Sequence, residues 1–315
     1  MRHIPGSAAI GEPLHRPIVT IGNFDGIHLG HQAILKTVTD RARDLEGEAV
    51  VYTFEPHPRK VLRPEKAPAL LTTLEQKLEL LEMAGVDVVV VEPFTEAFAR
   101  TGADAFVQLL HQRLRPIEVY VGYDFHFGRD REGSMRMLTE MGPRLGFAVT
   151  IIPEVTAEDG DVNSTRIREL LTQGEPERAA RMLGRPFTIR GSVVRGDARG
   201  RILGFPTANL EVENELLPAA GVYVGHLRVL DSEGRSSPAE LPAVINLGRR
   251  PTFEDSQRFV VEAHILDWNG DLYGRRVELA FRARLREERR FPSVDALREQ
   301  IARDVEDGRR RLEAR

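Results

Sequence analysis

The stretch that decides the fold of the first half of the chain is IVTIGNFDGIHLGH, residues 18–31. A strand-like run ends at Ile21, a glycine-flanked turn follows, and an amphipathic helical pattern begins near Leu29. Gly22 and Gly26 allow a tight turn and let a ligand approach the backbone closely. The helix directs its free N–H groups and the positive end of its dipole at the turn, which favours an anion. We therefore predict a phosphate site formed by Gly22, Asn23, Phe24, Asp25, Gly26 and Gly30.

Two histidines follow this turn. His28 and His31 lie three residues apart, so their imidazoles share one face at a helix start. Such a pair can stabilise charge that builds on a phosphoryl group, and these transfers need no covalent intermediate. A metal site is the alternative, but no third histidine or carboxylate is obviously placed to complete it. We interpret His28 and His31 as catalytic groups of a transfer reaction.

Around this stretch, the first half of the chain alternates between two kinds of segment. Apolar runs typical of strands cover residues 17–21, 49–54, 86–91, 117–123 and 147–152, and helix-like segments cover 29–45, 74–84, 103–114 and 135–145. This alternation predicts βαβ units and a Rossmann-like parallel sheet covered on both faces. Ligands bind such sheets beyond the carboxyl ends of the strands, where residues 22–31, 55–58 and 122–128 fall.

The pattern changes after a short helical connector that ends at Gly184. Strand-like runs cover residues 187–195, 222–230, 243–247, 259–266 and 276–285, divided by Gly, Pro, Asn and Asp. Short strands with this turn chemistry predict an antiparallel barrel or sandwich. Ser293 is a plausible N-cap for a terminal helix that carries an apolar stripe. We predict two domains, residues 1–184 and 185–315.

Composition excludes several classes of protein. The chain of 315 residues is 41% hydrophobic and 29% charged, which describes an ordinary globular protein of about two domains. Its formal net charge of −4 argues against nucleic-acid or anionic-membrane partners. The absence of cysteine excludes disulfides and thiolate zinc sites. Because no apolar run approaches the ~20 residues of a membrane span and no leader pattern is visible, we expect a cytoplasmic protein.

A second phosphate element is predicted at NSTRIR, residues 163–168. Ser164 and Thr165 can cap a helix and donate to phosphate oxygens, and Arg168 can supply charge for a leaving pyrophosphate. Alone, this stretch would be an ordinary capped helix with a basic face. Together with the H-x-G-H string of residues 28–31, it resembles the nucleotidylyltransferase superfamily, in which that string binds the phosphates of ATP.

Residues 15–180 further resemble the FMN adenylyltransferase module of bacterial FAD synthetases. The resemblance rests on GNFDGIHLGHQ (22–32), TFEPHP (53–58), VGYDFHFGRDREG (121–133) and VNSTRIR (162–168). In that family the second and third of these stretches line the flavin-nucleotide site, which implies that His57, Asp124 and Phe125 bind flavin. His126 departs from the family pattern, in which arginine is more usual.

The start of the second domain, residues 191–209, is rich in glycine. Backbone N–H groups of such a loop can surround phosphates, which would assign Gly191, Gly196 and Gly204 to nucleotide binding. The glycines alone fit a flexible hairpin better. The deciding feature is PTAN, residues 206–209, because Thr207 and Asn209 lie two apart on an extended segment. They face the same side and offer the hard oxygen ligands that Mg²⁺ prefers.

Four further stretches closely resemble the riboflavin kinase module: LPAAGVYVG (217–225), INLGRRPTF (245–253), VEAHILDWNGDLYG (261–274) and REERRFPSVDALREQIARD (286–304). In that family the glutamate of the V-E-x-H strand, here Glu262, is the general base for the ribityl hydroxyl, and the PTAN residues bind Mg²⁺ and nucleotide. The resemblance implies a barrel fold for this half.

Both modules occur in the order of bifunctional bacterial riboflavin kinase/FAD synthetases. The resemblance implies that ATP phosphorylates riboflavin to FMN and adenylylates FMN to FAD, with Mg²⁺ in both steps. Two alternatives stay open at this point. One is a flavin- or nucleotide-binding regulator without chemistry, although the histidines and Glu262 are present. The other is a transferase that acts on a different small phosphate, with a barrel that only binds flavin.

Overall fold

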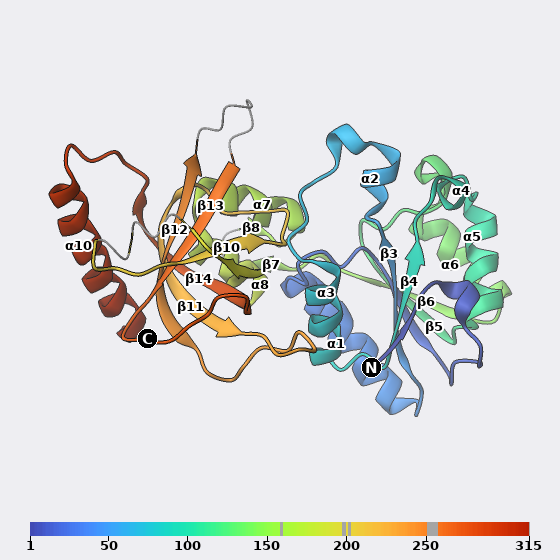
Figure 1. The fold of residues 1–315 in the computed structure, drawn as a ribbon. Helices are drawn as coiled ribbons and strands as arrows, with labels where there is room; N and C mark the ends of the chain where they lie inside the picture. The colour runs from blue at the N-terminus through green and yellow to red at the C-terminus, as the bar shows by residue number, and fades with distance from the viewer. Residues whose placement is uncertain (158–159, 197–199, 201–202, 251–257, 315) are drawn as a thin grey trace. The chain divides into compact units, whose positions relative to one another are not determined.

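The computed structural model describes residues 1–157, 160–196, 200, 203–250 and 258–314. It divides into two compact units, Met1–Asn163 and Ser164–Arg315 (Figure 1). Within the described ranges, no helix combines the length and the apolar character that crossing a membrane requires.

The first unit is built on a six-stranded sheet in which every neighbouring pair is parallel. In spatial order its strands are β1 (Arg2–Ile4), β4 (Val88–Pro93), β3 (Ala49–Glu55), β2 (Ile18–Ile21), β5 (Glu118–Gly122) and β6 (Ala148–Ile152). All four residues of β2 are buried, as expected for a central strand covered on both faces. The predicted parallel sheet is confirmed, and β1 is an edge strand that the sequence pattern did not predict.

Helices cover both faces of this sheet (Figure 1). They are α1 (Leu29–Asp44), α2 (Pro58–Leu62), α3 (Leu74–Met83), α4 (Glu96–Ala99), α5 (Ala103–Leu109), which continues into the π-helical turn η3 (Leu110–Leu114), and α6 (Met135–Arg144). Short 3-10 turns are η1 (Ser7–Ala9), η2 (Pro64–Lys66) and η4 (Arg129–Arg131), and β7 (Thr156–Ala157) pairs with β8 (Gly160–Asp161). Successive strand residues point to opposite faces. Accordingly, Val51 packs with Leu35 of α1 and Leu81 of α3, whereas its neighbour Val50 belongs to the cluster of Phe106.

The second unit contains a closed barrel whose strand pairs are all antiparallel. In order around the barrel its strands are β10 (Ala208–Val212), β13 (Arg258–Ile265), β12 (Leu241–Arg250), β11 (Gly221–Val229), β14 (Arg276–Glu287) and β9 (Phe187–Val194). Of the two predicted arrangements, the barrel is correct and the sandwich is not. The terminal helix α10 (Val294–Glu313) begins as predicted, because the Ser293 hydroxyl accepts a hydrogen bond from the Ala296 N–H at 3.1 Å.

Two helices, α7 (Ser164–Gln173) and α8 (Pro176–Leu183), belong to the same compact unit as the barrel. The Ala219 N–H donates to the Leu171 carbonyl at 2.9 Å, and the Glu177 carboxylate accepts from the Arg284 N–H at 3.2 Å. The boundary between the compact units therefore falls in the sequence between Asn163 and Ser164, although α8 ends at a left-handed Gly184 as the predicted connector requires. A functional division into residues 1–184 and 185–315 stays a prediction.

Candidate active sites

The first site lies at the point where the strand order of the parallel sheet reverses. The strands that follow β2 in sequence, β3 and β4, lie on one side of it, and β5 and β6 lie on the other. Ligands bind open parallel sheets at such a switch point, beyond the carboxyl ends of the strands. The turn after β2, the loop that follows β3 at Glu55 and the loop that follows β5 at Gly122 thus lie at neighbouring positions on one edge of the sheet. These are the loops that the sequence assigned to phosphate and flavin.

The two histidines stack directly on one another at the start of α1. His28 is the N-cap, and its Nδ1 accepts a hydrogen bond from the His31 N–H at 3.3 Å. The imidazole centroids are 3.7 Å apart with 19° between the ring planes, and the Phe24 ring lies 5.0 Å from His31. An Nδ1 that accepts leaves the Nε2–H of a neutral His28 as a donor. The structure brings this predicted pair together at the helix end, where an anion is favoured.

The environment of His31 keeps its imidazole neutral. Burial, followed by the charges of His28 and Lys77, lowers its pKa well below the usual value of 6.5. Its Nδ1 is buried and has no hydrogen-bond partner within the described part of the chain. A neutral imidazole at position 31 can interact with an anion only through an N–H donor.

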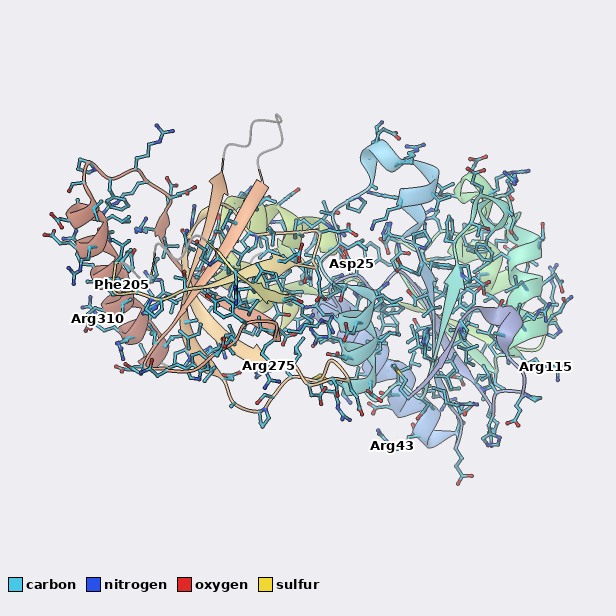
Figure 2. The ribbon with its side chains drawn as sticks, viewed as in Figure 1. Asp25, Arg43, Arg115, Phe205, Arg275 and Arg310 are labelled. Atoms are coloured by element: carbon cyan, nitrogen blue, oxygen red, sulfur yellow. The ribbon has the colours of Figure 1, made fainter. Side chains whose placement is uncertain are left out.

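Asp25, labelled in Figure 2, fixes the turn to the segment before α3. Its buried carboxylate accepts hydrogen bonds from the Leu71 N–H at 3.0 Å, from the Thr72 N–H at 3.3 Å and from the Thr72 hydroxyl at 3.4 Å. Gly26 has φ 81, and an added Cβ would lie 2.6 Å from Leu71 Cδ1. These contacts give both residues a role in shaping the turn. Direct contact of either with ATP stays a prediction.

The flavin residues of the prediction lie on the loops beside β2. His57 is the N-cap of α2, and its Nδ1 accepts from the Arg59 N–H at 3.2 Å. Phe125 stacks on Phe127, with centroids 5.6 Å apart, at the border of the apolar cluster behind the loop. His126 Nδ1 lies 2.8 Å from the Asp124 carbonyl oxygen and 3.1 Å from an Arg131 guanidinium nitrogen. A guanidinium therefore lies beside His126, the position at which the sequence departs from the pattern of the family that it resembles.

The NSTRIR stretch forms the start of α7. Ser164 and Thr165 are its first two residues, and Arg168 lies one turn further on. Within the first unit, an added Cβ on Gly30 would lie 3.5 Å from the carbonyl oxygen of Val162, two residues before Ser164. The tighter contact of that Cβ would be with the His28 ring, whose Cε1 and Nδ1 would both lie 3.2 Å away. The participation of Ser164, Thr165 and Arg168 in the same site as the histidines stays a prediction.

The second site is a row of side chains across three strands of the barrel. Glu262 on β13 is the direct cross-strand partner of Asn209 on β10 and of Asn246 on β12. Direct partners point to the same face of a sheet. The Asn246 amide donates to Glu262 Oε2 at 3.4 Å. Asn246 was not predicted as a site residue, although it lies within the INLGRRPTF stretch. Residues 251–253 of that stretch lie outside the described residues.

Glycines allow the chain to pass closely over the PTAN residues. An added Cβ on Gly196 would lie 2.3 Å from Asn209 Nδ2, and one on Gly200 would lie 3.1 Å from Thr207 Oγ1. Gly204 has φ 88, which only glycine adopts readily. Gly191, by contrast, lies inside β9, where a Cβ would lie 2.4 Å from the Glu211 carbonyl oxygen. Close packing against the neighbouring strand therefore explains a glycine at position 191, and its predicted contact with phosphate is untested.

The oxygen donors of the second site fit a magnesium–nucleotide complex. Among the described residues, no group of three or more His, Asp or Glu side chains could hold a metal ion. A site made of the Thr207 hydroxyl and the Asn209 carbonyl needs no such group, because Mg²⁺ is commonly held by one or two protein oxygens and by substrate phosphates.

Comparison with known proteins assigns the family. The sequence model of FAD synthetase matches residues 12–166, and that of riboflavin kinase matches residues 183–312. The bifunctional riboflavin kinase/FMN adenylyltransferase of Escherichia coli K12 is 39% identical over 91% of this chain and 90% of its own. That of Pseudomonas fluorescens is 41% identical over 93% of this chain and 92% of its own. The chain belongs to this family.

Structural comparison finds a similar fold in a solved structure. A crystal structure described as a macrolide-efflux protein from Streptococcus pneumoniae has a TM-score of 0.88 and 32% identity, and covers 98% of this chain and 99% of that one. The enzyme uses ATP to make FMN from riboflavin and FAD from FMN. The predicted function is confirmed, and neither the regulator nor the transferase with another acceptor is supported.

Proposed function

We propose that the two reactions take place at separate sites. Adenylylation takes place at the turn after β2, and phosphorylation takes place on the face of the barrel sheet that carries Glu262. The observation that carries this proposal is that the two clusters of functional side chains lie in different compact units. The stacked His28 and His31 lie in the first unit, and the Asn209–Glu262–Asn246 row lies in the second.

In the adenylylation step, a phosphate oxygen of FMN attacks the α-phosphorus of ATP. The bond between that phosphorus and its bridging oxygen breaks, and pyrophosphate leaves. Negative charge is distributed over the phosphoryl oxygens, so preorganised donors lower the barrier. The N–H groups at the start of α1 and the Nε2–H of His28 supply such donors. Ser164, Thr165 and Arg168 hold the leaving pyrophosphate in this proposal.

The acceptor is oriented by the loops that flank β2. His57 and Asp124 bind polar groups of FMN, and Phe125 offers a ring for the isoalloxazine to pack against. The remaining turn residues, which are Gly22, Asn23, Phe24, Gly26 and Gly30, bring backbone N–H groups close to the ATP phosphates.

In the phosphorylation step, the Glu262 carboxylate accepts the proton of the terminal ribityl hydroxyl. The hydroxyl oxygen attacks the γ-phosphorus of ATP, and ADP leaves. The Asn246 amide holds the carboxylate in one orientation through its bond to Oε2. Thr207 and Asn209 would hold Mg²⁺, which supplies positive charge against the phosphate oxygens when it is bound. Gly196 and Gly204 place the loop backbone near the nucleotide.

Two variants test the separation of sites. Glu262→Gln, given ATP and Mg²⁺, should leave riboflavin unconverted but still turn added FMN into FAD. The double variant His28→Ala with His31→Ala should accumulate FMN and make no FAD. Chromatography of the flavins measures both outcomes. If either substitution abolished both steps in a protein that keeps its circular dichroism spectrum, the two-site proposal would be wrong. A cytoplasmic location stays a prediction from composition.

A further inference from the structure

A buried lysine that the reaction scheme does not yet use lies on α3. Lys77 is only 5% exposed, one turn after the N-cap Thr73. Its neighbours on the same helix, Leu74, Leu78 and Leu81, belong to the apolar cluster beneath the sheet. Within the described residues, the structure gives the ammonium group neither a hydrogen bond nor an ion pair, and its electrostatic neighbours act only through space.

Such a group is costly for the free protein. An ammonium that is removed from water without a partner loses far more solvation than a methionine of similar shape would. Burial accordingly lowers the pKa of Lys77 from its usual value of 10.5, and the nearby carboxylates of Glu55 and Asp25 only partly oppose this. Structural stability therefore does not explain a lysine here, whereas a bound anion would.

The charged neighbours of Lys77 belong to the two regions that the proposed function assigns to ATP and to FMN. Asp25 belongs to the turn after β2, and Glu55 ends β3 and belongs to the TFEPHP loop. The positive charge of Lys77 also contributes to the lowered pKa of His31. The Asp25 carboxylate is already occupied by the hydrogen bonds from Leu71 and Thr72. The ammonium thus lies near the turn after β2 and the end of β3, the two elements to which the proposed function assigns the ATP phosphates and FMN.

We propose that Lys77 is a phosphate-binding residue of the adenylylation site, whose ammonium binds an anionic phosphate oxygen of the FMN–ATP pair. This rests on the proposed location of that site. A compact ammonium with three donors suits a phosphate group that changes geometry during transfer. The bound phosphate supplies the partner that the folded protein alone does not.

The test compares Lys77→Met with Lys36→Met. Methionine keeps the length of the lysine stem and removes the charge. Lys36 lies on α1 with a side chain that is 77% exposed and forms an ion pair with Asp40 at 2.5 Å, so its variant controls for loss of a lysine elsewhere in the unit. For each full-length protein we would measure FAD formation at varied FMN and ATP, affinity for inorganic pyrophosphate by calorimetry, riboflavin phosphorylation, and the unfolding temperature.

Lys77→Met should lower kcat/KM for FAD formation about 10- to 100-fold, the factor that one hydrogen bond to a charged group contributes. Riboflavin phosphorylation should stay within about twofold, and the unfolding temperature should not fall, because an uncompensated buried charge has been removed. A weaker affinity for pyrophosphate with a raised KM for ATP would identify the ATP phosphates as the ligand. A raised KM for FMN alone would identify the FMN phosphate.

Unchanged FAD formation, or a loss that comes with a lower unfolding temperature, overturns the role of Lys77. The double variant His28→Ala with His31→Ala, assayed in parallel, separates this from failure of the site itself. If that double variant still makes FAD, the proposed site is wrong. If the double variant makes no FAD and Lys77→Met makes FAD at the normal rate, only the inference about Lys77 fails.

Discussion

Replacement of Gly196 by alanine tests whether Asn209 has to be where the structure places it. An added Cβ would lie 2.3 Å from Asn209 Nδ2 and 2.4 Å from Asn209 Cγ, whereas ordinary contacts begin near 3.4 Å. The Asn209 amide would therefore have to move by about 1 Å. The obstacle is the end of one side chain rather than backbone, and the φ of Gly196 is not in the left-handed region, so the fold should tolerate the change.

The consequence of this movement should be seen in one reaction only. A displacement of about 1 Å in a substrate-positioning group costs on the order of 100-fold in rate. Gly196→Ala should therefore phosphorylate riboflavin about 100-fold more slowly and convert added FMN to FAD at the normal rate. Gly11→Ala is the matched control, because nothing lies within 4 Å of a Cβ at that position. A Gly196→Ala enzyme with normal kinase activity would refute the role of Asn209, as would one in which both activities fall together.

Three further predictions follow from the geometry and the electrostatics. Asn246→Ala should lower kcat for riboflavin phosphorylation about fivefold and leave KM for ATP unchanged, because a 3.4 Å hydrogen bond to Glu262 is at the weak end of its class; an equal rise in KM would instead indicate a binding role. Thr207→Val should raise the Mg²⁺ concentration needed for half-maximal kinase activity and leave that for FAD formation unchanged, and a parallel change in both would contradict separate metal requirements. His31 has a lowered pKa in the folded state, so the unfolded chain binds more protons below pH 6.5 and stability falls as pH falls. Between pH 7.5 and 5.5 the wild type should lose about 1.4 kcal/mol of unfolding free energy more than His31→Gln, measured by urea denaturation at each pH.

The features that the sequence predicted well are local ones. A strand, a glycine turn and a capped helix are encoded within residues 18–31, and His28 and His31 share a face because of helical spacing alone. The shared orientation predicted for Thr207 and Asn209 on an extended segment stays a prediction. Ser293 caps α10 as the pattern indicated.

The features that it missed depend on pairing between distant segments. Asn246 meets Glu262 only because β12 and β13 pair in one register, and a shift by one residue would place the amide on the other face. The linear motif predicts Asp25 as a phosphate-site residue, but its carboxylate accepts hydrogen bonds from the backbone N–H groups of Leu71 and Thr72. Lys77 looks like a solvated helix lysine in sequence, and only the packing of α3 shows that it is buried.

The division of the chain illustrates the same limit. Helical pattern and turn chemistry identify α8 and its end at Gly184, but they do not show which unit the helix packs against. The hydrogen bonds that Leu171 accepts from Ala219 and Glu177 accepts from Arg284 decide that, and both join residues more than 40 positions apart in the sequence.

The most direct test of the two-site account is complementation in one solution. Glu262→Gln alone, with riboflavin, ATP and Mg²⁺, should form neither FMN nor FAD, and the His28→Ala, His31→Ala double variant alone should stop at FMN. An equimolar mixture of the two should form FAD, because FMN released by one variant is adenylylated by the other. A mixture of folded variants that accumulates FMN without forming FAD, or that leaves riboflavin unconverted, would contradict the claim that the two reactions use separate and independent sites.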